Sequence, residues 1–361
     1  MSGGGFVSRR TRAAVAVIGA VASAALLGGG ASASRSATMR FAVLATGTTN
    51  DANWGEAWYQ GVQLFQRNTG IKARWVGNIN APDQAENQAA ALASAGYDVI
   101  CICVGFAPDA ETKLAKQFPK TTFITFYEQP PAKLKAQPPN TVWMNVKQQD
   151  STFLAGVLAG LSTKTNVIGS VNGYAFPLLT RQPEGFALGA RCVNPKVKFE
   201  QKYINSWTDI QLANSATTSM MADGADIILS AGDTDIQGMY TAAAKKPNTY
   251  VVSQYADSYS AAPKVVLTSA LYGFDKVLNQ LFTKALHHQL TPREQDIYTL
   301  KEVGGLAPFR QHAAFVGAAN LKKVKQYQQW IASGKIRVPH DDNVIGKVGA
   351  GTKIDPKSIG C

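Results

Sequence analysis

Apolar runs of strand length alternate with segments of helical periodicity along most of the chain, and no other feature constrains the fold as strongly. The first series starts with an apolar run at 40–46 and a helical segment at 56–70, and it ends with an apolar run at 141–146. The second starts with a helical segment at 150–162 and ends with an apolar run at 249–255. Strands separated by helices of this length predict right-handed parallel βαβ units, in sheets with helices on both faces.

Two such series predict two lobes, since a chain of 361 residues exceeds the roughly 100–200 residues of a typical single domain. We expect an N-terminal lobe of residues 39–146 plus 269–291 and a C-terminal lobe of residues 147–268 plus 292–361. The chain then crosses between the lobes near Val146, Pro263 and Thr291. A cleft is expected where the carboxyl ends of the strands in the two sheets face each other.

The first 33 residues have the pattern of an export signal. Arg9, Arg10 and Arg12 precede a short run of small and apolar residues that ends at Ala31-Ser32-Ala33, a small-residue cleavage site. The run is too short for a membrane span, which needs about 20 apolar residues. We expect a soluble protein in the periplasm or another extracytoplasmic space, without a lipid anchor, because no cysteine follows the apolar run. The paired arginines leave the export route open between the general and the twin-arginine pathway.

Charge and cysteine content exclude few classes of protein. The formal net charge is +12, but the lysines and arginines are scattered, which favours a solvated basic surface over a nucleic-acid interface. Cys101 and Cys103 share one face of an apolar strand, so we expect them to pack as small hydrophobic residues rather than to pair. Cys192 and Cys361 form the one plausible disulfide, which the sequence does not establish.

Signals for catalysis and for metal binding are missing from the sequence. It contains no phosphate-binding loop, no H-E-x-x-H and no G-x-S-x-G. His287 and His288 are adjacent on a predicted helix and point about 100° apart, so they are poor joint metal ligands. The acidic residues at strand ends occur singly. We therefore predict no catalytic residue, no metal and no cofactor, and a binding protein rather than an enzyme.

The segment NDANWGEAWYQG, residues 50–61, enters the first helix of the first lobe. Trp58, Val62 and Phe65 recur at helical spacing and are core candidates. Trp54 lies one turn earlier, where it is either a hydrophobic staple on the helix start or an aromatic plate that stacks on a heterocycle. Side chains of Asn50, Asp51 and Asn53 around it can hydrogen-bond the donors and acceptors of a ring.

This segment resembles the first ligand loop of the basic membrane protein family, exported solute-binding proteins whose best-understood branch binds purine nucleosides for an ABC transporter. Asp51 matches the acid of that loop, Asn53 its small polar residue and Trp54 its stacking aromatic, whereas Gly55 departs from the asparagine of the nucleoside branch. The resemblance continues in order through NTVWMNVKQQDSTFLAGVLAG, GFALGARCVNP, SWTD, ADGADIILSAGDTDIQGMYTAA and VVSQYADSYSAAPKVVLTSA. It implies a two-lobed, type I periplasmic-binding-protein-like α/β fold with three inter-lobe crossings.

Two departures from the family bear on the ligand. Tyr255 and Tyr272 stand where the resemblance implies an acid and a lysine that serve the ribose, so a flatter, less hydroxylated ligand is favoured. Asp257 matches a late aspartate of the family and either contacts ligand or caps its own turn. Trp207, in SWTD, either lines the cleft or caps the sheet. With strand-end residues of the second lobe added, the predicted ligand-binding set is Asn50, Asp51, Asn53, Trp54, Asn172, Tyr174, Phe176, Asp233, Tyr255, Asp257 and Tyr272.

The resemblance predicts a solute-binding protein that captures a purine base, a nucleoside or a similar flat heterocycle for an ABC importer. Its expected partners are that ligand and the transporter's membrane subunits, with no nucleic acid, and we expect a monomer. Two alternatives stay open. The same domain could present its ligand to a membrane receptor as a sensor, or it could hydrolyse nucleosides with Asp51 or Asp233, which requires a paired carboxylate or a metal.

Overall fold

Two sheets of mostly parallel strands organise the computed structural model, which describes residues 38–127 and 134–361. The predicted export signal lies outside the described residues. The strand order in the first sheet is β11-β5-β4-β3-β1-β2, and all its pairs are parallel. Its strands are β1 (Phe41–Leu44), β2 (Ala73–Val76), β3 (Val99–Ile102), β4 (Thr122–Phe126), β5 (Thr141–Val146) and β11 (Glu294–Tyr298).

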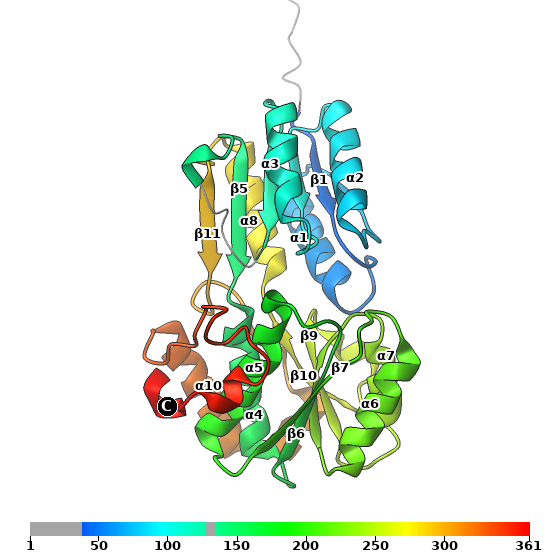
Figure 1. The fold of residues 1–361 in the computed structure, drawn as a ribbon, viewed down its shortest axis with the longest axis vertical. Coiled ribbons are helices and arrows are strands. Elements are labelled where there is room, and N and C mark those ends of the chain that lie inside the picture. Colours follow the sequence, from blue (N-terminus) through cyan, green and yellow to red (C-terminus); the bar gives the residue numbers. More distant parts are fainter. Residues whose placement is uncertain (1–37, 128–133) are drawn as a thin grey trace, which may run out of the picture. The chain divides into compact units, whose positions relative to one another are not determined.

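The second sheet has the order β12-β10-β9-β8-β6-β7, and only the short β12 runs antiparallel among its described pairs. Its strands are β6 (Val167–Asn172), β7 (Lys198–Tyr203), β8 (Ile227–Ala231), β9 (Tyr250–Tyr255), β10 (Val266–Leu271) and β12 (Gly305–Leu306). Figure 1 shows the two sheets as separate groups of strands, each flanked by helices. The prediction of two α/β lobes is confirmed.

In the central strands, such as β1 and β3, alternating side chains are buried on opposite faces of the sheet, as expected for a parallel sheet covered on both sides. In β1, Phe41 packs with its ring 4.8 Å from Phe65 and 5.0 Å from Phe282. Ala42 and Leu44, which point to the other face of the sheet, belong to a separate core. The helices of this lobe are α1 (Trp54–Thr69) and α8 (Phe274–Leu286) on the first face and α2 (Pro82–Ser94) and α3 (Pro108–Gln117) on the second.

The second lobe is layered in the same way. Helices α4 (Gln148–Ser162) and α5 (Pro177–Val193) cover one face of its sheet, and α6 (Ile210–Ala222) and α7 (Ile236–Ala243) cover the other. The later helices are α9 (Ala313–Val316), α10 (Ala318–Ala332) and α11 (Ala350–Lys353), and the 3₁₀ turns are Leu134–Ala136, Ser258–Ala261, Arg310–His312 and Pro356–Ile359. In the part of the chain that the structure describes, no helix is long and apolar enough to cross a membrane.

The strand pairing places two of the three crossings later than predicted. The first lies between β5 and α4, as expected near Val146, but β10 stays in the second sheet to Leu271 and β11 pairs with β5 in the first sheet. The second crossing is therefore at residues 272–273 and the third follows Tyr298, rather than near Pro263 and Thr291. β11 escaped notice because it is an amphipathic edge strand with three exposed or half-exposed residues between Glu294 and Tyr298.

Two disulfides are present in the described chain. Cys192 pairs with Cys361 and ties the C-terminus to the end of α5. Cys101 also pairs with Cys103, which corrects the expectation that both pack as free hydrophobic residues. The prediction assumed that one strand contains both cysteines, but β3 ends at Ile102 and the chain turns at Cys103, so the two Cα atoms lie 5.4 Å apart.

Candidate ligand-binding site

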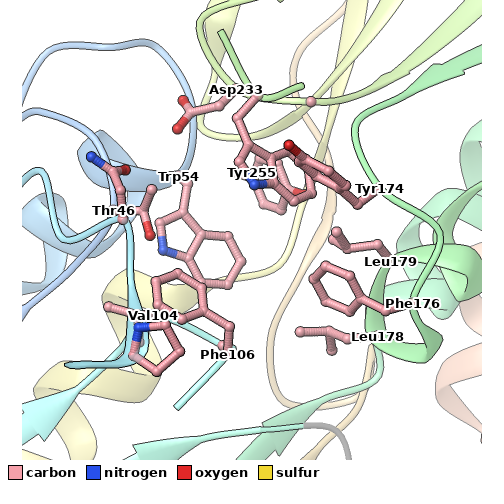
Figure 2. A pocket seen from close by; sticks show the side chains of 15 residues that line it. Thr46, Trp54, Val104, Phe106, Tyr174, Phe176, Leu178, Leu179, Asp233 and Tyr255 are labelled. Atoms are coloured by element: carbon pink, nitrogen blue, oxygen red, sulfur yellow. The ribbon is translucent and has the colours of Figure 1, made fainter. Parts of the chain in front are cut away.

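A pocket of about 310 Å³ lies between the two lobes, at the carboxyl ends of their strands (Figure 2). Loops that follow parallel strands meet at one edge of a sheet, and this edge is the usual ligand position in open α/β folds. The first lobe contributes Thr46, Trp54, Asn80, Pro82, Val104, Gly105 and Phe106. The second contributes Tyr174, Phe176, Leu178, Leu179, Trp207, Gly232, Asp233 and Tyr255.

Trp54 forms part of the pocket wall and is also anchored in the core. Its indole Nε1 donates a hydrogen bond of 3.1 Å to the backbone carbonyl of Cys103. Its ring makes edge contacts, with centroids 5.1 Å from Phe274, 5.2 Å from Tyr255 and 5.4 Å from Phe126. Only 8% of the residue is exposed. Trp54 therefore packs in the core at the start of the helix while part of it lines the pocket, and its stacking on a heterocycle stays a prediction.

Three aromatic side chains of the second lobe line the pocket together. The ring of Trp207 lies 4.9 Å from that of Tyr174 and 6.2 Å from that of Phe176, and Tyr174 is 39% exposed. Trp207 packs directly on Gly173, where a Cβ would collide with the indole. Glycine at that position therefore lets Trp207 lie flat beside the strand end. Of its two sequence interpretations, the structure favours a place in the cleft.

Asp233 is the one acidic residue of the lining. Its Oδ1 is buried and has no hydrogen-bond partner among the described residues. Burial, together with the negative charges of Asp51 and Asp235, raises the pKa of Asp233 to about 7. Asp235 accepts a hydrogen bond of 2.6 Å from the backbone N–H of Asp233, which fixes the loop after β8.

Asp51 organises the loop before α1 and does not line the pocket. Its carboxylate accepts backbone N–H groups of Thr48 at 2.9 Å, Asn53 at 2.9 Å, Gly55 at 3.1 Å and Glu56 at 3.0 Å. Burial raises its pKa although these hydrogen bonds act in the opposite direction. Four backbone donors occupy the oxygens of this carboxylate, so Asp51 shapes the loop that presents Trp54.

Asn53 also lies outside the lining and instead links the two lobes. Its Nδ2 donates to the backbone carbonyl of Asp233 at 3.0 Å and is 3.5 Å from that of Gly232. Next to it, Ser258 Oγ of the second lobe donates to the carbonyl of Ala52 at 2.7 Å. The loop that the sequence singled out for ligand contact thus makes the polar contact between the lobes.

The remaining candidates are engaged by hydrogen bonds or an ion pair with other residues, and all but Tyr255 lie outside the pocket lining. Asn172 bonds Ser170 and the carbonyl of Lys202, and Asn50 accepts from Thr48 Oγ1 at 3.2 Å. Asp257 caps its own 3₁₀ turn and pairs with Arg310 at 2.5 Å. Tyr272 is fully buried and donates to Gln254. Tyr255 does line the pocket, but its hydroxyl exchanges hydrogen bonds with Gln182.

The structure therefore brings Trp54, Tyr174, Phe176, Asp233 and Tyr255 of the predicted set together around one pocket. Sequence reasoning missed Phe106 and its neighbours 104–105, although they follow a strand end as Tyr174 does. It also missed Leu178 and Leu179, which lie in the first turn of α5 after Pro177. Among the described residues, no group of three or more histidines, cysteines or acids has metal-binding geometry.

Comparison with known proteins agrees with this geometry. A model of the Bmp family, described as ABC transporter substrate-binding protein PnrA-like, matches residues 38–342. The chain belongs to the Bmp family. The resemblance noted in the sequence is thereby confirmed, and the protein is of a family of substrate-binding proteins rather than of enzymes.

Individual relatives of this Bmp protein are distant. It is 26% identical over 316 residues to the CD4+ T-cell-stimulating antigen of Listeria monocytogenes, covering 81% of this chain and 86% of the relative. It is 27% identical over 184 residues to the ABC transporter nucleoside-binding protein BmpA of Lactococcus lactis, covering 50% of each. An ABC transporter solute-binding protein of Aeropyrum pernix K1 superposes with a TM-score of 0.73 at 19% identity, over 87% of this chain and 98% of the other. The type I periplasmic-binding-protein fold is thus confirmed.

Proposed function

We propose that this Bmp-family protein captures a purine base, a nucleoside or a similar flat heterocycle between its two lobes and delivers it to the membrane subunits of an ABC importer. The observation that carries the proposal is the pocket between the lobes, in which Trp54 and Phe106 of one lobe face Tyr174 and Phe176 of the other (Figure 2), and which Trp207 also lines. Stacking of a base on an aromatic side chain contributes about 1–3 kcal/mol. The name of the Lactococcus lactis relative, a nucleoside-binding protein, supports this ligand class.

Within that class, the residues favour a free base or another sugar-free heterocycle. Tyr272 is buried outside the pocket and Asp257 is paired with Arg310, so neither is placed to hold a ribose. The hydroxyl of Tyr255 is engaged by Gln182. When a ribose diol leaves water, protein groups must replace the hydrogen bonds that its hydroxyls made with water. Buried hydroxyls without such partners weaken binding by their desolvation free energy.

We further propose that the protein acts after export, as a monomer and without catalysis. Residues 1–33 have the pattern of an export signal, and no cysteine directly follows their apolar run. This pattern supports release without a lipid anchor. A hydrolase that used Asp51 would need a free carboxylate, whereas four backbone N–H groups occupy this one. Movement of the lobes about the three crossings would admit the ligand and close over it.

Calorimetric titration of ligand-free protein with adenine, adenosine, guanine, guanosine, ribose and glucose tests the proposal. We expect binding of bases at least as tight as that of their nucleosides, and no release of base from a nucleoside on prolonged incubation. Tight binding of ribose or glucose, with no measurable heat from any purine, would overturn the ligand class while leaving family and fold intact.

A further inference from the structure

The pocket is polarised along its length, which the family and the proposed function do not explain. Figure 2 shows Asp233 toward one end and Phe106, Phe176 and Leu178 around the other, with Trp54 between them. The apolar end is closed across the lobes, because Leu178 Cδ2 lies 3.3 Å from the position that a Cβ on Gly105 would take. A ligand that fills this pocket therefore has one polar end and one end without hydrogen-bonding groups.

The polar end has an acid without a basic neighbour. In the described part of the chain, the pocket lining includes no lysine, arginine or histidine. Of the ion pairs among the described residues, none involves Asp233, Asp51 or Asp235. Since Oδ1 of Asp233 is buried without a partner, the site lacks a donor that its carboxylate needs.

The aromatic walls favour the same kind of partner. The face of a tryptophan, tyrosine or phenylalanine ring attracts a cation within about 6 Å of its centroid. Trp54, Tyr255 and Tyr174 line the same pocket as Asp233, and the ring centroids of Trp54 and Tyr255 lie 5.2 Å apart. An aromatic pocket with one unpaired carboxylate is suited to a cationic ring.

On the premise that this pocket is the ligand site, we infer that among flat heterocycles it prefers one with a protonated nitrogen over a neutral one of the same shape, with the nitrogen donating to Asp233 and the apolar end of the ring against Leu178 and Phe106. A charge-assisted hydrogen bond is shorter and stronger than a neutral one. It would also pair a carboxylate that is otherwise buried alone, which is the arrangement that costs most. Asp233 is then the residue that makes the site prefer a positively charged ligand.

The electrostatics of the free site agree with this assignment. The groups that face Asp233 are Asp51, from the loop before α1, and Asp235, from its own loop. Burial and both negative charges raise the pKa of Asp233 to about 7, and burial raises that of Asp235 to about 7 as well. A cationic ligand lowers the pKa of a carboxyl group beside it. Binding near neutral pH should therefore release protons.

A pair of probes of nearly equal shape tests the inference: 4-aminoquinoline, a cation near neutral pH, and 4-methylquinoline, which is neutral there. We expect the wild-type protein to bind the amine at least about tenfold more tightly. Asp233→Asn should remove this preference. Asp223→Asn, which deletes the same charge at an exposed position at the end of α6, should retain it.

A second measurement uses only the wild-type protein, so it tests the inference even if Asp233→Asn fails to fold. Titration of 4-aminoquinoline in two buffers of different ionisation enthalpy should reveal proton release. Equal affinity for the two probes, or failure to bind either while purines still bind, would overturn the inference and leave the proposed function standing. Absence of binding by both quinolines and by every purine would overturn the proposed function itself.

Discussion

The side-chain amide of Asn53 donates a hydrogen bond of 3.0 Å to the backbone carbonyl of Asp233, and this bond joins the loop before α1 in one lobe to the end of β8 in the other. Ser258 Oγ and the carbonyl of Ala52 form a second inter-lobe hydrogen bond of 2.7 Å. Both lie directly beside the pocket lined by Trp54 and Asp233. Loop 50–53 is therefore placed to couple contact between the lobes to the position of the pocket wall.

Asn53→Ala should weaken ligand binding although Asn53 does not line the pocket. A typical net hydrogen bond contributes about 0.5–1.5 kcal/mol, so affinity should fall by roughly two- to twelvefold, mainly through faster dissociation. Stopped-flow measurement of the dissociation rate, with a purine that binds the wild-type protein, checks this. Asn68→Ala, which removes an exposed amide bonded to Asn279, is the matched control and should leave the rate unchanged. An unaltered rate in Asn53→Ala would show that the inter-lobe bond has no part in retaining ligand.

Tyr174→Ala should reduce affinity without reducing stability. The ring is 39% exposed and contacts the pocket, so its loss should cost about 1–3 kcal/mol of binding, or roughly five- to 150-fold. Titration gives the affinity and thermal unfolding of the ligand-free protein gives the stability. A marked fall in melting temperature with unchanged affinity would assign Tyr174 to packing alone.

Trp54→Ala should reduce both affinity and stability. The sequence alone left open whether Trp54 is a hydrophobic staple on the helix start or a plate that stacks on a ligand. The structure shows an indole that is 8% exposed, surrounded by aromatic rings and bonded to the carbonyl of Cys103. Truncation of a large buried aromatic residue costs about 3–5 kcal/mol. Unfolding in denaturant should report a loss of this size, and an unchanged midpoint would contradict the described packing.

Three residues of one loop show how far the sequence could predict this site. Trp54 was placed correctly at a strand-to-helix turn because that position depends only on the local pattern. Asp51 occupies the same loop, but its hydrogen bonds to backbone N–H groups depend on the folded path of that loop, which a single sequence does not reveal. Likewise, Asn53 meets Asp233 only through the relative position of the lobes, with a sequence separation of 180 residues. Parallel layering was predictable, whereas contacts between lobes were not.

Glu111 should make the stability of the protein depend on pH. It is 1% exposed, and burial raises its pKa from 4.5 to about 8. Between these values the folded state binds more protons at this group than the unfolded state, so its contribution to stability falls as pH rises from about 4.5 to about 8. Glu111→Gln imitates the protonated acid and should raise the melting temperature near pH 8 relative to wild type, but not near pH 4. An equal shift at both pH values would contradict the assignment.

Cys192→Ser should destabilise the protein more than Cys101→Ser. The first removes a disulfide that spans 169 residues, and the second removes one that spans 2. A disulfide stabilises mainly by restricting the unfolded chain, more so for long loops, and a native one contributes about 2–5 kcal/mol. Chemical unfolding of the two single variants provides the comparison. Equal losses would show that local packing, rather than loop closure, accounts for both.

Native mass spectrometry of the protein purified from its own source, followed by identification of any released small molecule, tests the central claim most directly. We predict one bound molecule per chain that contains a flat aromatic heterocycle, present on the wild-type protein and depleted on Tyr174→Ala prepared in the same way. A bound sugar, peptide or other non-aromatic solute would contradict the claim that the aromatic walls of the inter-lobe pocket define the ligand.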